Sequence, residues 1–103
     1  MTRICLTDGS GRWFDAEKAE KFVEETEWNG SNHISKATGS QWEHETLYKT
    51  VSGQFVLNHW SNRQGTLETY ELLSSADAAK WLAINKYEAD ELCAEEFAAL
   101  EIK

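Results

Sequence analysis

Hydrophobic and polar residues alternate along the middle of the chain, and this alternation predicts three antiparallel strands. Residues 47–51 and residues 54–60 each have the pattern of a strand, and Ser52-Gly53 between them is typical of a two-residue turn. A loop is predicted over residues 61–66, and a third strand over residues 67–72. Consecutive short strands with short connections indicate an antiparallel meander.

Short strands are also predicted nearer the N-terminus. Residues 3–7 and residues 12–14 have strand composition, and the run Asp8-Gly9-Ser10-Gly11 between them favours a turn, which together predict a hairpin. A further short strand is expected over residues 33–36, after a turn at residues 29–32.

The segment from Asp15 to Trp28 fits two different patterns. Asp15 is a suitable N-cap for a helix. Ala16, Ala19 and Phe22 follow it at helical spacing, which predicts a short helix. From Phe22 to Trp28, however, the residues alternate with period two, which favours a strand. The pattern leaves open where a helix would give way to a strand.

Helical spacing dominates the C-terminal part of the chain. Ser74 stands three residues before Asp77, an acidic variant of the capping box, and predicts a helix that runs to about Asn85. A second helix is expected from about Ala89 to Leu100. Its expected inward positions are Leu92, Cys93, Phe97 and Leu100, and its expected outward positions are Glu91, Glu95 and Glu96.

Strands first and helices last predict an α+β fold, a twisted antiparallel sheet with two C-terminal helices packed on one face. The chain has 103 residues, of which 41% are hydrophobic, so it is long enough to bury one core. It contains no proline, repeat or low-complexity tract that would mark a linker. We therefore expect a single domain over residues 1–103.

The net charge of the chain indicates which classes of binding partner to expect. The net charge is −8, and the arginines are only Arg3, Arg12 and Arg63. Nucleic acids and anionic membranes are bound by clustered cations, so neither partner is expected. No stretch approaches the apolar length of a membrane span. A basic protein surface is the partner that this charge favours.

Neither the cysteines nor the histidines have the spacing of a metal site. Cys5 and Cys93 are far apart, and His33, His44 and His59 are eleven and fifteen residues apart, unlike compact ligand motifs. No metal and no cofactor are therefore expected. The first residues lack the apolar core of a signal peptide, so the cysteines are interpreted as reduced structural thiols of a cytoplasmic protein.

One run of the chain carries a resemblance to a protein family. Residues 38–50, with the pattern TGSQWEHE-x-LY-x-T, resemble a family of short bacterial proteins. The resemblance covers most of the chain, because further matching positions lie from Phe14 to Leu82. It implies a folded, self-standing unit and carries no activity, cofactor or partner with it.

The polar and aromatic residues 39–45 contain the strongest candidate for chemistry. One hypothesis makes His44 a general base that Glu43 or Glu45 orients, as in a minimal hydrolase. Alternation along a strand would place both carboxylates on the face opposite His44. The preferred interpretation is therefore a polar loop in which Trp42 covers the edge of the core, and an enzyme or metal site ranks last.

Binding is the favoured class of function. Aromatic rings beside uncharged polar groups can anchor a protein contact or line a small pocket, and core packing is the alternative explanation. The acidic residues of the C-terminal segment are typical of a solvated face, and they could also occupy a basic site on another protein. The candidate binding residues are Gln41, Trp42, His44, Trp60, Arg63, Glu91, Glu95 and Glu96.

The function predicted first is a small acidic, non-catalytic binding or regulatory module that acts on a protein partner. The alternative is a small-molecule-binding domain with a pocket near Trp42 and Trp60. Two copies of the chain could also pair through an exposed strand edge to form a homodimer.

Overall fold

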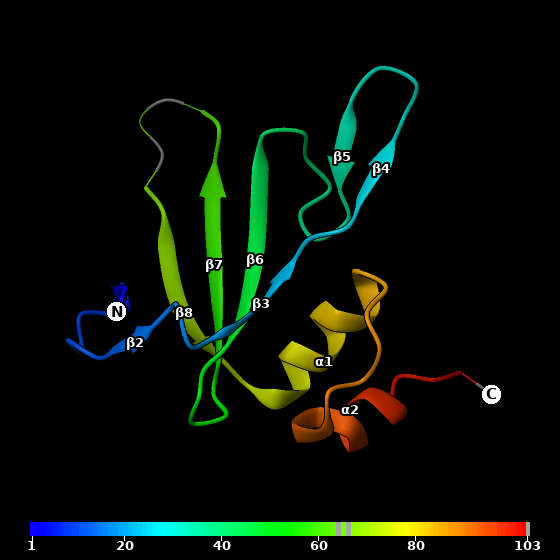
Figure 1. Cartoon of the computed structure of the whole chain (residues 1–103). Coiled ribbons are helices and arrows are strands. Elements are labelled where there is room, and N and C mark those ends of the chain that lie inside the picture. Colours follow the sequence, from blue (N-terminus) through cyan, green and yellow to red (C-terminus); the bar gives the residue numbers. More distant parts are fainter. Residues whose placement is uncertain (64, 66, 103) are drawn as a thin grey trace.

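A four-stranded antiparallel sheet is the frame of the molecule (Figure 1). The computed structural model describes residues 1–63, 65 and 67–102. The strands lie in the order β3-β6-β7-β8, and the fold is α+β, as the sequence predicts. The strands are β3 (Glu20–Val23), β6 (Glu43–Lys49), β7 (Phe55–Ser61) and β8 (Thr69–Leu73).

Each face of this sheet carries its own apolar cluster. Leu47 and Phe55 point to one face and pack against the C-terminal helices. Tyr48 and Val56, the next residue of each strand, point to the other face. The alternation that predicted the strands therefore places side chains in two different layers.

Helix α1 (Ser75–Ile84) confirms the first predicted helix. The Ser74 Oγ accepts a hydrogen bond from the Asp77 backbone N–H at 3.1 Å, so Ser74 is the N-cap. Figure 1 shows α1 alongside the sheet, and its small and large apolar residues are buried there. These residues are Ala78, Ala79, Trp81 and Leu82.

The second helix is shorter than predicted. It consists of a single 3₁₀ turn, η1 (Glu91–Cys93), followed by α2 (Ala94–Ala98). Asp90 has extended backbone angles, and its side chain accepts from the Leu92 N–H at 2.9 Å, so the helical segment begins only after Asp90. The predicted inward positions Leu92 and Leu100 are wrong because both are exposed, whereas Cys93 is fully buried.

The N-terminal hairpin confirms the two strands predicted there, although the first is two residues shorter and the second is shifted by one residue. Strand β1 (Arg3–Cys5) pairs with β2 (Trp13–Asp15). The hairpin covers one end of the sheet face opposite the helices, where Leu6 and Phe14 pack against Tyr48 and Val56 (Figure 1).

The predicted helix after Asp15 is wrong, and the alternative strand pattern is right. The Asp15 carboxylate accepts from the Thr2 and Glu17 backbone N–H groups at 3.2 and 3.1 Å, which forms a turn instead of a helix start. The chain then forms β3, and afterwards β4 (Thr26–Trp28), which pairs with β5 (His33–Ser35). Pairing of Phe22 with Leu47 decides the conformation, because it buries the Phe22 ring against the helix layer.

The meander is confirmed, with changed boundaries. Strand β6 begins at Glu43, four residues earlier than predicted, because it pairs with β7 along its full length. Strand β8 begins at Thr69, two residues later than predicted, where its pairing with β7 begins opposite His59. Part of the predicted loop over residues 61–66, namely Gln64 and Thr66, lies outside the described residues.

Candidate functional site

The candidate site lies where β6 begins and β7 ends, and we call it the tryptophan end. Glu43 and Ser61 are paired, so the residues just beyond them, Trp42 and Asn62, face each other. The Asn62 backbone N–H donates to the Trp42 carbonyl oxygen at 2.9 Å, which extends the pairing by one step. The tryptophan end comprises Trp42, His44, Trp60, Asn62 and Arg63.

His44 and Trp60 form a stacked pair within this site. The two residues are directly opposite each other on β6 and β7. Their ring centroids are 4.6 Å apart, and the ring planes differ by 30°. Cross-strand pairing sets this contact, because directly opposed side chains share one face of a sheet.

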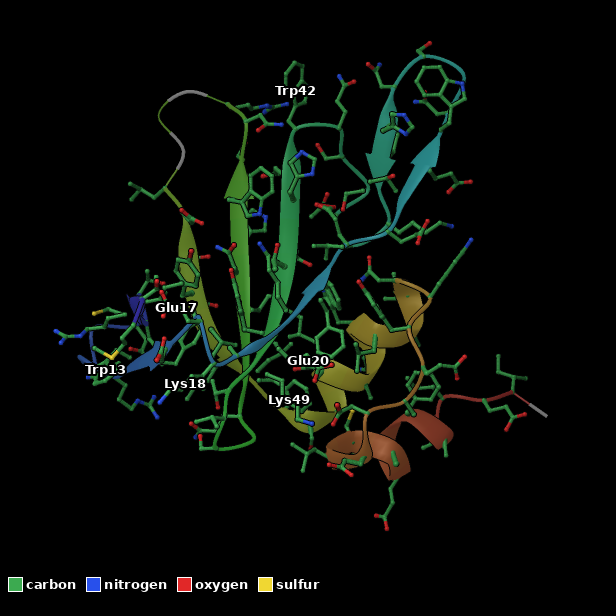
Figure 2. The ribbon with its side chains drawn as sticks, in the orientation of Figure 1. Trp13, Glu17, Lys18, Glu20, Trp42 and Lys49 are labelled. Carbon is green, nitrogen blue, oxygen red and sulfur yellow. The ribbon has the colours of Figure 1, made fainter. Side chains whose placement is uncertain are left out.

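Trp42 is exposed, but its backbone is held in place. The Ser40 Oγ accepts from the backbone N–H groups of Trp42 and Glu43 at 3.0 and 3.3 Å. The Arg63 guanidinium carbon lies 5.9 Å from the centre of the indole ring, within the range of a cation–π contact. The Trp42 side chain is nevertheless 43% exposed. Figure 2 shows it at the upper end of the sheet.

Glu24 is the carboxylate that orients His44. Its Oε1 lies 2.8 Å from the His44 Nδ1 and also accepts from the Glu45 backbone N–H at 3.1 Å. The His44 Nε2 lies 3.1 Å from the Asn62 Nδ2, so both ring nitrogens are engaged. The Glu24 Oε2 is buried and has no hydrogen-bond partner among the residues that the structure describes.

Glu45 belongs to the opposite face of β6, as strand alternation predicts. Its Oε1 accepts from the Trp81 indole N–H at 3.2 Å, so it contacts the helix layer. Burial raises the pKa of Glu45, while the Trp81 hydrogen bond and the charge of His59 partly oppose that rise. The hypothesis that Glu43 or Glu45 orients His44 therefore fails on geometry.

The structure separates the predicted binding residues into two groups. Gln41 is next to Trp42 in the chain, and Gln41 and the tryptophan end form one group. Glu91, Glu95 and Glu96 form the other, which we call the acidic segment. The Lys49 Nζ lies 3.1 Å from an Asp90 carboxylate oxygen, so the acidic segment lies near the far end of β6.

The acidic segment itself is mixed in exposure. Glu91 and Glu95 are exposed, whereas Glu96 is half-buried and accepts from the Ser75 hydroxyl at 3.2 Å. Figure 2 shows Lys49 and Trp42 toward opposite ends of the sheet. The two groups of predicted residues therefore lie at opposite ends of β6.

A hollow of about 200 Å³ lies elsewhere, between the N-terminal hairpin and the connection from β6 to β7. Trp13, Phe14, Thr50 and Gln54 line it together with neighbouring residues. The Arg3 guanidinium carbon lies 4.9 Å from the centre of the Trp13 ring, which is half exposed. The molecule thus carries a second pairing of arginine with an exposed tryptophan.

The described residues were compared with the requirements of a metal site and of a membrane-spanning helix. Within residues 1–63, 65 and 67–102, no cluster of three or more His, Cys, Asp or Glu side chains could hold a metal ion. No helix in the same part of the chain is long and apolar enough to cross a membrane. Cys5 is exposed and Cys93 is buried, and neither is in a disulfide.

Sequence reasoning missed Glu24 and Asn62. Glu24 lies twenty positions before His44, within an acidic run that has the composition of a solvated face. Only the pairing of Val23 with Thr46 brings Glu24 beside His44. Asn62 is found once the register of β6 and β7 is known, because it follows the residue that pairs with Glu43.

Comparisons with protein families, with curated proteins and with solved structures found no match to this chain. The geometry of the described residues is therefore the basis for the function proposed below.

Proposed function

We propose that this protein is a non-catalytic module that binds a protein partner through the tryptophan end. One observation carries the proposal. The Trp42 ring is 43% exposed, although its backbone is hydrogen-bonded on both sides and Arg63 lies against the ring. The resemblance of residues 38–50 to a family of short bacterial proteins stays a prediction and adds no partner.

Tryptophan and arginine are the residues that most often dominate the binding energy of protein interfaces. A large ring that is already fixed loses little conformational entropy when a partner covers it. At Trp42, Ser40 and Asn62 hold the backbone, and the Arg63 guanidinium lies 5.9 Å from the centre of the ring. The stacked Trp60 and His44 rings extend the aromatic surface next to it.

The charge of the chain favours a basic partner. The net charge of −8 attracts positively charged surfaces over distances longer than direct contact. The acidic segment lies away from the tryptophan end, so its contribution is to speed the encounter and to orient the partner. Such an effect weakens as salt screens the charges.

A hydrolase centred on His44 has less support. A general base needs a ring nitrogen that can reach a substrate proton. Glu24 and Asn62 occupy the two ring nitrogens of His44. A small-molecule site is better supported at the hollow beside Trp13 than next to Trp42, because a hollow of about 200 Å³ lies there.

The proposal is tested by quantitative capture of partners from a native cell lysate with tagged protein. Trp42→Ala should lower the affinity for a captured partner roughly 30-fold, since truncating an interface tryptophan costs about 2 kcal/mol or more. Trp13→Ala is the matched control, because Trp13 is also exposed and also contacts an arginine. Circular dichroism checks that both variants are folded.

The capture results for these variants show which surface binds the partner. Loss of the partner with Trp42→Ala but not with Trp13→Ala supports the tryptophan end. Unchanged capture by Trp42→Ala contradicts it. Loss caused only by reversing Glu91, Glu95 and Glu96 to lysine would assign binding to the acidic segment instead.

A further inference from the structure

We propose that His44 is a proton-sensitive switch that reverses the hydrogen-bonding face of Asn62 at the tryptophan end. Protonation would turn the exposed Asn62 carboxamide so that it presents its NH₂ group outward instead of its oxygen. The switch is a property of the isolated chain. Its effect on partner binding rests on the function proposed above.

The hydrogen bonds of His44 define its neutral form. An ionised carboxylate can only accept, so the bond of 2.8 Å to Glu24 requires a proton on the His44 Nδ1. The Nε2 then carries a lone pair and accepts from the Asn62 Nδ2 at 3.1 Å. A single neutral tautomer thus satisfies both contacts.

A second proton on the ring breaks this arrangement. With both nitrogens protonated, the Nε2–H faces the Asn62 NH₂ group, and two donors cannot bond to each other. Rotating the carboxamide by half a turn brings its Oδ1 to the Nε2–H and restores the bond. Asn62 is exposed, so this rotation displaces no core side chain.

The surroundings of His44 suit a positive charge on the ring. The Glu24 side chain is only 10% exposed, and its Oε2 has no partner among the described residues. A buried carboxylate that lacks a full set of partners is stabilised by a cation beside it. The face of the Trp60 ring against the imidazole attracts a cation as well.

Other charged groups near His44 come from each neighbouring element. From β6 itself, Glu43 and Glu45 project from the opposite face. His59 lies opposite Glu45 on β7, and Arg63 follows the end of that strand. Helix α1 presents the uncharged Trp81, and the segment after β3 contributes Glu24 and Glu25. Glu24 is the charged group of this set that contacts the His44 ring directly.

The consequence for binding follows from the charge and from the exposed atom. Protonation adds one positive charge next to the exposed Asn62 and replaces an outward acceptor by an outward donor. A basic partner that donates to the Asn62 oxygen would lose that bond and meet an added repulsion. Association should therefore weaken as the pH falls from about 8 to about 5, the range in which histidine changes charge.

The test follows His44 and Asn62 in the isolated protein by nuclear magnetic resonance between pH 8 and pH 5. The His44 ring signals and the Asn62 side-chain amide signals should shift with one common midpoint.

The controls separate His44 from the other histidines. In His33→Gln, which removes the ring that packs at a tilt against Trp28, the Asn62 signals should shift as in the wild type. In His44→Gln they should no longer shift in this range.

Two results would overturn the switch. One is Asn62 amide signals that do not change in the wild type while the His44 ring signals shift. The other is Asn62 amide signals that still shift over this pH range in His44→Gln. The first result is measured in the wild-type protein, so it decides the matter even if His44→Gln does not fold. Neither result bears on the capture of a partner by Trp42, so failure of the switch and failure of the proposed function are distinguishable.

Discussion

Glu43, His44 and Glu45 are neighbours in the chain but lie in three different environments. Glu43 is exposed, and His44 lies against Trp60 and Glu24 on one face of the sheet. Glu45 lies on the other face against helix α1 and accepts from Trp81. At the scale of the residue, the face of the strand and the partner across it decide the chemistry.

Glu45 should make the stability of the protein depend on pH. Burial raises its pKa above the ordinary value of 4.5, so the folded state holds the proton more tightly than the unfolded chain. The stabilisation is fully present below about pH 4.5 and is lost as the pH rises through the folded pKa. Urea unfolding of Glu45→Gln between pH 4 and pH 7 should lack this loss.

The matched control for this prediction is Glu43→Gln, on the same strand and face but exposed. Its unfolding free energy should follow the wild-type dependence on pH. An identical pH dependence in Glu45→Gln and the wild type would contradict the assignment.

The connection from β6 to β7 contacts the segment that begins the second helix. Gly53 has a φ of +87°, and its N–H donates to the Thr50 carbonyl oxygen at 2.9 Å. A Cβ at this position would lie 3.1 Å from the Leu92 Cδ1, so the turn also contacts the segment that begins the second helix. At the scale of the element, a single glycine allows the backbone to turn and also leaves room for Leu92 of the next segment.

Gly53→Ala should lower the free energy of unfolding by about 1–2 kcal/mol for its backbone angle, and further if Leu92 must move. Gly9→Ala is the matched control, because Gly9 has a φ of +81° and open space around its Cβ position. Urea unfolding should show the larger loss for Gly53→Ala. Equal losses would show that Leu92 moves aside without cost.

At the scale of the whole molecule, one sheet supports two apolar clusters. Leu82 belongs to the cluster on the helix side, and Leu6 belongs to the cluster under the N-terminal hairpin. The two clusters meet through β6 and β7, whose alternate residues enter one cluster or the other. This shared frame predicts that the chain unfolds as one unit.

Leu82→Ala and Leu6→Ala should each lower the free energy of unfolding by about 2–5 kcal/mol, the usual cost of this truncation in a core. Each variant should keep a single transition that is the same by near-ultraviolet and far-ultraviolet circular dichroism. Leu67→Ala, at a side chain that is 84% exposed, should unfold like the wild type. A separate early transition in Leu6→Ala would show that the hairpin unfolds independently.

Local sequence patterns were enough to predict the elements that form through contacts between residues close together in the chain. The N-terminal hairpin, the meander and the N-cap at Ser74 all follow from turn chemistry, alternation and capping within a few residues. The Phe22 segment was ambiguous because its residues fit both periods. Pairing with β6, a strand more than twenty positions away, resolved it.

The candidate site was predictable only in part for the same reason. Trp42, Trp60, His44 and Arg63 stood out by residue type and lie together. Glu24 and Asn62 did not, since a carboxylate in an acidic run and an amide in a loop have ordinary composition. Their roles arise from strand pairing and register, which connect distant residues.

The α+β class, the antiparallel meander and the start of the first C-terminal helix follow from the amino-acid sequence alone, because each depends on periodicity and capping over a short stretch. Tertiary contacts, by contrast, are needed for residues 20–23 to form a strand and for His44 to meet Glu24. In these cases the conformation is stabilised by contacts between residues that are far apart in the chain. Such contacts cannot be predicted from a local sequence pattern.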